Sequence, residues 1–93
     1  MTDEIEHKPE LHRFDVLVNG ELAGSTRYRV APGVRIFFHT EIDTRFEGRG
    51  LASKLIAAAL DETRAEGLSV EPQCPYVRGF IAKHAEYLDM VAE

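Results

Sequence analysis

The sequence is poor in cysteine, in long apolar runs and in positive charge. Its single cysteine, Cys74, cannot form an internal disulfide, and a reducing compartment suits a lone thiol. No apolar run approaches the roughly 20 residues that cross a bilayer. We therefore expect a cytoplasmic protein that makes no membrane contact.

Positive charge is too scarce for a nucleic-acid partner. The chain has 11 Lys and Arg against 16 Asp and Glu, a formal net charge of −5, and offers no basic face that could neutralise a phosphate backbone. The Cys, His and acidic residues also match no metal-ligand spacing. The sequence thus predicts neither nucleic acid nor a metal as a partner.

The length of 93 residues fits one domain, with no room for a second core. Residues 1–10 contain four acids and no apolar core, which argues against a signal or transit peptide and predicts a flexible acidic tail. We expect residues 11–93 to form the folded domain.

The first half of the chain has the pattern of an antiparallel meander. Apolar residues alternate between Leu11 and Val18, as in a half-buried strand. The dipeptide Asn19-Gly20 favours a type I′ hairpin turn, so the chain should return over residues 21–30. After the turn Ala31-Pro32-Gly33, residues 34–42 are rich in Ile and Phe and predict a third, more buried strand.

The stretch from Glu47 to Leu60 joins a glycine-rich turn to the strongest helix pattern in the chain. Gly48 and Gly50 allow a tight turn without a Cβ, and the free N–H groups of a helix start favour an anion such as phosphate. A purely structural strand-to-helix turn is the alternative. Two nucleotide motifs do not fit, because Ser53 replaces the third glycine of a dinucleotide fingerprint and no Gly-Lys-Ser/Thr follows.

The second half predicts a strand-helix-strand unit followed by a helix. Gly67 should end the first helix, residues 68–71 form a short strand, and a second helix runs from about Tyr76 to His84. Strands 34–42 and 68–71 should be parallel neighbours joined by a right-handed crossover. The expected fold class is α+β with a mixed sheet.

This order of elements resembles the GNAT acyltransferase superfamily, whose phosphate motif is Arg/Gln-x-x-Gly-x-Gly/Ala. The motif can begin at Arg45 and end at Gly50, which matches every letter, or begin at Glu47 and end at Ala52, which keeps the usual spacing to the helix. We prefer the second placement, in which Glu47 replaces the Arg or Gln. The resemblance extends from Phe14 to Tyr87 and is closest to small single-domain members.

The small-member resemblance rests on three further stretches: residues 38–42, Cys74-Pro75 and Lys83-His84. It implies a minimal GNAT-like domain that binds acetyl-CoA or another acyl-CoA, with the diphosphate on the glycine turn and the pantetheine arm along the end of strand 34–42. The implied cofactor-binding residues are Ile42, Arg45, Glu47, Gly48, Arg49, Gly50, Leu51, Ala52, Ser53 and Lys54. Arg45, Arg49 and Lys54 would hold phosphate charges.

Cys74 is the first candidate for a catalytic group. Since Pro75 favours the first position of a helix, Cys74 should be its N-cap, where the helix dipole favours a thiolate. The resemblance places it where the acyl thioester ends, so Cys74 can contact or accept the acyl group. A small buried side chain with no chemical role is an equal alternative.

Glu41 and His39 are the candidate general bases for an incoming amine, because they share one face of strand 34–42. A solvated Glu and a packed His are the structural alternatives. Tyr76 and His84 are weaker candidates, and His7 and His12 receive no role.

The preferred function is acyl-CoA-dependent N-acyl transfer, either by direct attack of the amine or through an acyl thioester on Cys74. The main alternative is a CoA-binding or protein-binding module that has lost catalysis, which Glu47 and the small size favour. A bare anion-binding scaffold is the third. The acceptor amine can belong to a small molecule or to a protein.

Overall fold

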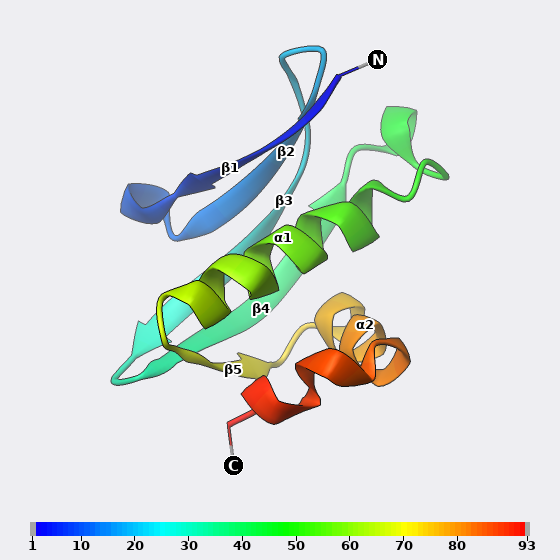
Figure 1. The fold of residues 1–93 in the computed structure, drawn as a ribbon. Coiled ribbons are helices and arrows are strands. Elements are labelled where there is room, and N and C mark those ends of the chain that lie inside the picture. Colours follow the sequence, from blue (N-terminus) through cyan, green and yellow to red (C-terminus); the bar gives the residue numbers. More distant parts are fainter. Residues whose placement is uncertain (1, 93) are drawn as a thin grey trace.

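The computed structural model describes residues 2–92. One five-stranded sheet crosses the molecule in the order β1-β2-β3-β4-β5 (Figure 1). The first four strands are antiparallel, and β5 pairs with β4 in parallel. Their bounds are Asp3–Lys8 for β1, Arg13–Val18 for β2, Glu21–Ala31 for β3, Val34–Ile42 for β4 and Ser69–Pro72 for β5. The α+β class and the parallel β4-β5 pair predicted from the sequence are confirmed.

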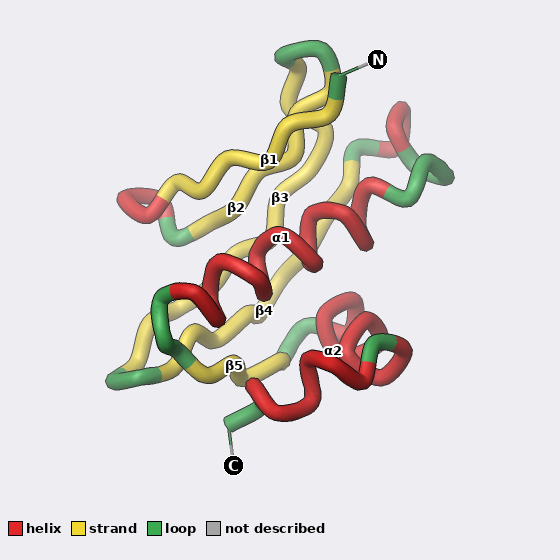
Figure 2. Tube along the Cα trace, in the orientation of Figure 1, coloured by secondary structure: helices red, strands yellow, loops and turns green. Residues whose placement is uncertain are grey.

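Two α-helices and three short 3₁₀ helices complete the fold (Figure 2). Helix α1 spans Leu51–Ala65 and α2 spans Pro75–Lys83, while the 3₁₀ segments are η1 (Pro9–Leu11), η2 (Thr44–Phe46) and η3 (Ala85–Met90). Gly67, with φ of 75°, ends α1 as predicted, since the left-handed conformation suits glycine. No helix among residues 2–92 is long and apolar enough to cross a membrane.

The hairpin between β2 and β3 turns at the predicted dipeptide. Asn19 and Gly20 have φ values of 51° and 82°, which fits the positive φ that a type I′ turn requires at both central residues. The meander therefore follows from local turn chemistry.

The predicted acidic tail is wrong for Asp3–Lys8, which forms β1 and pairs along its whole length with β2. Ile5 packs against the core and His7 stacks on Phe14 with ring centroids 4.0 Å apart. The sequence hides this strand because only one inward position is aliphatic and acids occupy the positions between. The backbone pairing with β2 and the stacking of His7 on Phe14 stabilise the strand in place of further aliphatic side chains.

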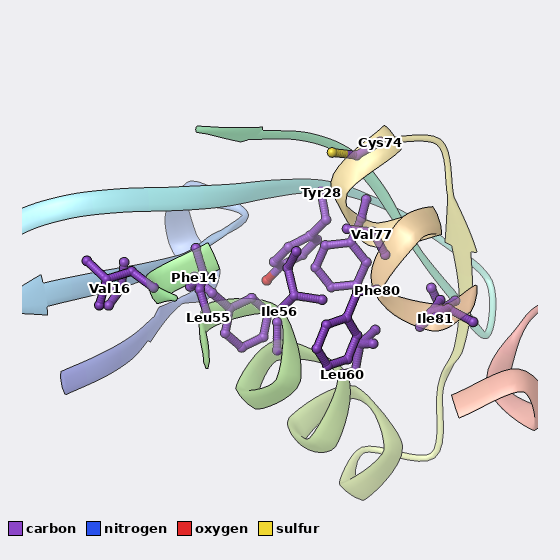
Figure 3. Close-up of a cluster of buried hydrophobic side chains, with 14 of the residues drawn as sticks. Phe14, Val16, Tyr28, Leu55, Ile56, Leu60, Cys74, Val77, Phe80 and Ile81 are labelled. Atoms are coloured by element: carbon purple, nitrogen blue, oxygen red, sulfur yellow. The ribbon is translucent and has the colours of Figure 1, made fainter. Parts of the chain in front are cut away.

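Both helices pack on the sheet face that carries the alternating apolar residues of β2. Phe14, Leu55, Leu60, Val70 and Val77 are at most 1% exposed and belong to a single cluster (Figure 3). Because α1 and α2 share this cluster, the start of α1 is held close to the start of α2. That proximity forms the candidate site.

The opposite face of the sheet is polar and is anchored on Asp15, which is fully buried. Ser25 donates a hydrogen bond to Asp15 at 2.6 Å, and Lys8 and Arg13 lie 3.1 and 2.9 Å from its oxygens. Burial acts to raise the pKa of Asp15, but the Ser25 hydrogen bond and the two cations outweigh burial and leave the pKa below its usual value. Asp15 thereby fastens β1 to β2 and β3.

The substitution Asp15→Asn tests this anchor. We expect it to lower the free energy of unfolding by about 2 kcal/mol at pH 7, because Lys8 and Arg13, whose side chains are partly exposed, lose a buried carboxylate partner. Since the folded pKa of Asp15 is depressed, its contribution exists above the unfolded pKa and is lost as the pH falls through the folded pKa. Denaturant titrations from pH 7 to pH 3 should therefore show a flatter acid limb in the variant. Asp89→Asn, at an exposed carboxylate paired with Arg64, is the control, and an equal loss in both variants would contradict the account.

Candidate functional site

The site begins at the connection from β4 to α1, which contains η2 and the glycine turn. Gly48 and Gly50 both adopt the left-handed conformation, with φ of 81° and 73°, and Gly50 is the N-cap of α1 without a side-chain hydrogen bond. The first backbone bond of the helix joins the Lys54 N–H to the Gly50 carbonyl at 3.2 Å. The N–H groups of residues 51–53 precede that bond, so this helix start has donors available for an anion.

A cavity of about 190 Å³ lies at this helix start. Six of the ten predicted cofactor residues line it, together with Tyr76 from α2: Ile42, Glu47, Gly48, Gly50, Ala52 and Ser53. A larger groove of about 330 Å³ between α1 and α2 adjoins it, because both hollows are lined by Ala52, Ser53 and Tyr76. The groove extends to Lys83 and His84.

The other four predicted cofactor residues do not line the turn cavity. Arg45 contacts Asp43 and Glu21 at 3.2 and 2.7 Å. Its hydrogen bonds to these two carboxylates raise the pKa of the Arg45 guanidinium. Lys54 pairs with Asp3 of β1 at 2.8 Å. The Arg49 guanidinium lies 5.4 Å from the ring centre of Phe46, and the Leu51 side chain is buried in the core. Among the described residues that line the cavity, the donors nearest the helix start are therefore the backbone N–H groups.

The parallel strands separate beside this cavity. The β4-β5 register ends at Phe37 and Pro72, and the Phe37 carbonyl then accepts from the N–H groups of Gln73 and Cys74 at 2.9 and 3.0 Å. Beyond Phe37, β5 no longer pairs with β4. The end of β4 therefore faces the cavity with a backbone edge that β5 does not occupy.

Cys74 is the N-cap of α2, as the sequence predicts. The residue belongs to the buried cluster (Figure 3) and is only 2% exposed. Its thiol donates to Thr40 Oγ1 at 3.3 Å. Thr40 in turn shares a hydrogen bond of 2.9 Å with Thr26. The thiol thus lies inside the domain on the core side of β4, next to the separation point.

Glu41 and His39 lie on the other face of β4, as the strand alternation predicts. Their side chains are 58% and 52% exposed, and His39 Nε2 is 3.7 Å from Glu41 Oε2. Arg27 of the neighbouring strand is 3.8 Å from the same carboxylate. The arrangement offers a solvent-accessible carboxylate and imidazole side by side, which is what proton removal from an amine requires.

The sequence spacing did not predict one group of potential metal ligands. His7, Glu62 and Glu66 bring their ligand atoms within 4.8 Å of one another, although β1 and α1 are far apart in sequence. His7 contacts Glu62 through Nδ1 and Tyr28 through Nε2, and Arg35 holds Glu66 at 3.0 Å. The hydrogen bonds from Arg35 are the main reason why the pKa of the Glu66 carboxyl is lowered. This group already has protein partners on each member and ties β1 to α1.

Comparison with known proteins identifies the family. A family model described as "GCN5-related N-acetyl-transferase" matches residues 13–90. The chain belongs to the GCN5-related N-acetyltransferase family. It is 32% identical to protein NATD1 of Bos taurus over 89 residues, which are 91% of this chain and 79% of that protein, and 30% identical to protein NATD1 of Gallus gallus over 90 residues, which cover 92% and 82%.

Solved structures agree on the GNAT fold. A GCN5-like protein from Staphylococcus aureus superposes with a TM-score of 0.72 at 21% identity, covering 96% of this chain and 87% of that one. Ard1 from Thermoplasma volcanium gives a TM-score of 0.62 at 19% identity, covering 78% and 54%. The GNAT family uses acetyl-CoA as its usual co-substrate, so the glycine turn is the place to look for that ligand in this member.

The conformation of Gly50 gives a direct test of the turn. A Cβ at Gly50 meets nothing within 4 Å, so any cost of Gly50→Ala comes from the left-handed backbone and should be about 1–2 kcal/mol in unfolding free energy. Gly79→Ala is the matched control: it lies inside α2, is equally uncrowded and has no left-handed φ, and it should stabilise by up to about 1 kcal/mol. Thermal and urea unfolding of both variants measure this contrast, and an identical sign for both would contradict the turn geometry.

Proposed function

We propose that this GNAT member is an acetyl-CoA-dependent N-acyltransferase. The observation that carries the proposal is the uncapped start of α1, whose N–H groups face a cavity beside the separated end of β4. An anion-binding helix start next to an unpaired strand edge suits a ligand with a diphosphate and an amide-containing arm.

The chain's own groups fit such a ligand in three places. Backbone N–H groups around Gly50, Ala52 and Ser53 would hold the diphosphate, and the β4 edge would hydrogen-bond the pantetheine amides. The adjoining α1-α2 groove ends in Lys83 and His84, which offer cationic and hydrogen-bonding groups to a further phosphate. Glu47 also lines the cavity and opposes the diphosphate, so the fit depends on the backbone donors.

Direct transfer requires an amine, a base and an acyl thioester. In the proposed mechanism Glu41, assisted by His39, takes a proton from the ammonium form of the acceptor. The freed nitrogen bonds to the acyl carbon and the carbon–sulfur bond breaks. The nitrogen then loses a second proton to become the amide, and the sulfur, which leaves as a thiolate, takes up a proton in its place. The exposure of Glu41 and its 3.7 Å approach to His39 support this assignment.

Cys74 is the alternative acyl acceptor. Its burial and its hydrogen bond to Thr40 favour a positioning role over a covalent one, because a nucleophile must reach the thioester. Direct transfer is therefore the route we favour.

The Cys74→Ser variant tests the choice of route. We expect it to retain turnover within about tenfold, since a hydroxyl can still hydrogen-bond Thr40 and one such bond is worth about 1 kcal/mol. Intact-protein mass spectrometry of the wild type after mixing with acetyl-CoA should show no acyl adduct. A stable adduct on Cys74 that is lost in the variant together with turnover would establish the covalent route instead.

The base assignment has its own test. Glu41→Gln should lower kcat by about 10² to 10⁴ with acetyl-CoA affinity unchanged, because it removes the proton acceptor and leaves the turn intact. Glu71→Gln, on β5 of the same sheet, should leave kcat unchanged. Unaltered kcat in Glu41→Gln would refute the role of Glu41.

A CoA-binding or protein-interaction module without catalysis is the second candidate, and Glu47 at the cavity is the observation that favours it. Calorimetric titration with acetyl-CoA beside a broad amine screen separates the two, because tight binding without turnover supports the module. We also keep, as part of the acyltransferase proposal, the cytoplasmic location and the absence of nucleic-acid and membrane partners that the sequence led us to expect.

A further inference from the structure

A separate cavity of about 230 Å³ lies beside Glu41, at the end of β3 and β4. Among residues 2–92, two carboxylates line it, Glu41 and Asp43, and no cationic side chain does. The other lining residues are Leu22, Ala23, Gly24, Ser25 and Ile42. Ile42 also lines the cavity at the glycine turn, so the two hollows adjoin the same residue of β4. A ligand in this second cavity would therefore lie next to the proposed cofactor site.

The cavity depends on a close approach of β3 to β4 at Gly24. A Cβ at this glycine would lie 2.5 Å from Ile42 Cδ1 and 2.6 Å from the Glu41 carbonyl oxygen, closer than packed atoms tolerate. Glycine at this position thus lets the two strands meet while leaving the hollow above them free of a side chain. Leu22 and Ala23 give it an apolar wall.

The charges around the cavity favour a cation. Asp43 contacts Arg45 at 3.2 Å, and Arg45 also pairs with Glu21 at 2.7 Å, so this arginine is shared between two carboxylates and lies outside the cavity lining. On the other side, Arg27 and His39 approach Glu41 only at 3.8 and 3.7 Å. Asp43 already accepts the Arg45 backbone N–H at 2.9 Å and the Arg45 guanidinium at 3.2 Å on both oxygens. A ligand ammonium would therefore bind in competition with Arg45 at Asp43 and with Arg27 and His39 at Glu41.

From this arrangement we propose that the acceptor is a primary amine that carries a second ammonium group, with its reactive nitrogen at Glu41 and its second charge at Asp43. The inference rests on the proposed N-acyl transfer. Two residues along extended backbone span about 6.6 Å, which a short alkyl linker bridges. When the reactive ammonium gives its proton to Glu41 and becomes a neutral amide, Asp43 still pairs with the second charge, and the linker lies against Leu22 and Ala23.

Equilibrium binding of 1,4-diaminobutane and butylamine, followed by amide chemical shifts of the ¹⁵N-labelled chain, tests the site without relying on turnover. We expect the diamine to bind about threefold tighter or more, as an added ion pair implies, with the largest shifts at residues 22–25 and 41–43. Asp43→Asn should bring the two dissociation constants together, and Arg45→Gln should tighten diamine binding by removing a competing cation. Asp89→Asn, an arginine-paired carboxylate remote from the cavity, should change neither.

Two outcomes overturn the inference: equal affinity of both amines for the wild type, or shifts that lie elsewhere. Acetyl-transfer assays with the same two amines separate it from the proposed function. If the chain acetylates both amines with equal kcat/KM, the function stands and the acceptor assignment fails. If the diamine binds at the cavity but acetyl-CoA yields no product with any amine, the acyltransferase proposal fails and with it the acceptor role, while the cation-binding cavity remains.

Discussion

The backbone conformation of Gly50, the N-cap of α1, is the constraint on which the rest of the site depends. A residue at φ of 73° introduces the helix, and the absence of a capping side chain leaves the first N–H groups without an internal partner. The Ser, Thr and Asp residues that usually cap helices do so from an extended backbone conformation, which the left-handed φ of Gly50 does not provide. The glycine therefore leaves the first donors for an external anion, which is why we place the diphosphate at this point.

The second constraint is the separation of β4 from β5. The Phe37 carbonyl accepts two N–H groups, from Gln73 and Cys74, so the chain leaves the sheet at this point and enters α2 at once. Burial of Cys74 and Val77 then draws α2 into the shared core, and Tyr76 is brought to the glycine turn. The cavity at the turn, the adjoining groove and the free edge of β4 are therefore consequences of one short connection. Glu41 and His39 lie on the opposite face of the same strand.

Much of this arrangement could be predicted because it is encoded locally. Asn19-Gly20, the glycines at 48, 50 and 67, and the Cys74-Pro75 pair each act through the backbone conformation of a few residues. Six of the predicted cofactor residues line one cavity because five of them lie within residues 47–53; their role as a cofactor site stays a prediction. Pairings between distant segments were out of reach: Lys54 meets Asp3, His7 meets Glu62, and acidic β1 becomes a strand only through its contacts with β2 and α1. The cavity at Gly24 was missed for the same reason, since it depends on how closely β3 and β4 approach.

The central claim is that the backbone amides at the start of α1 bind the diphosphate of the coenzyme. Amide hydrogen exchange with and without acetyl-CoA tests it most directly. The account predicts that residues 50–53 exchange readily in the free chain, as donors without an internal partner should, and become at least about tenfold slower on binding, as ligand linkage implies. Acetyl-CoA binding that leaves these amides unchanged and slows exchange elsewhere would contradict it.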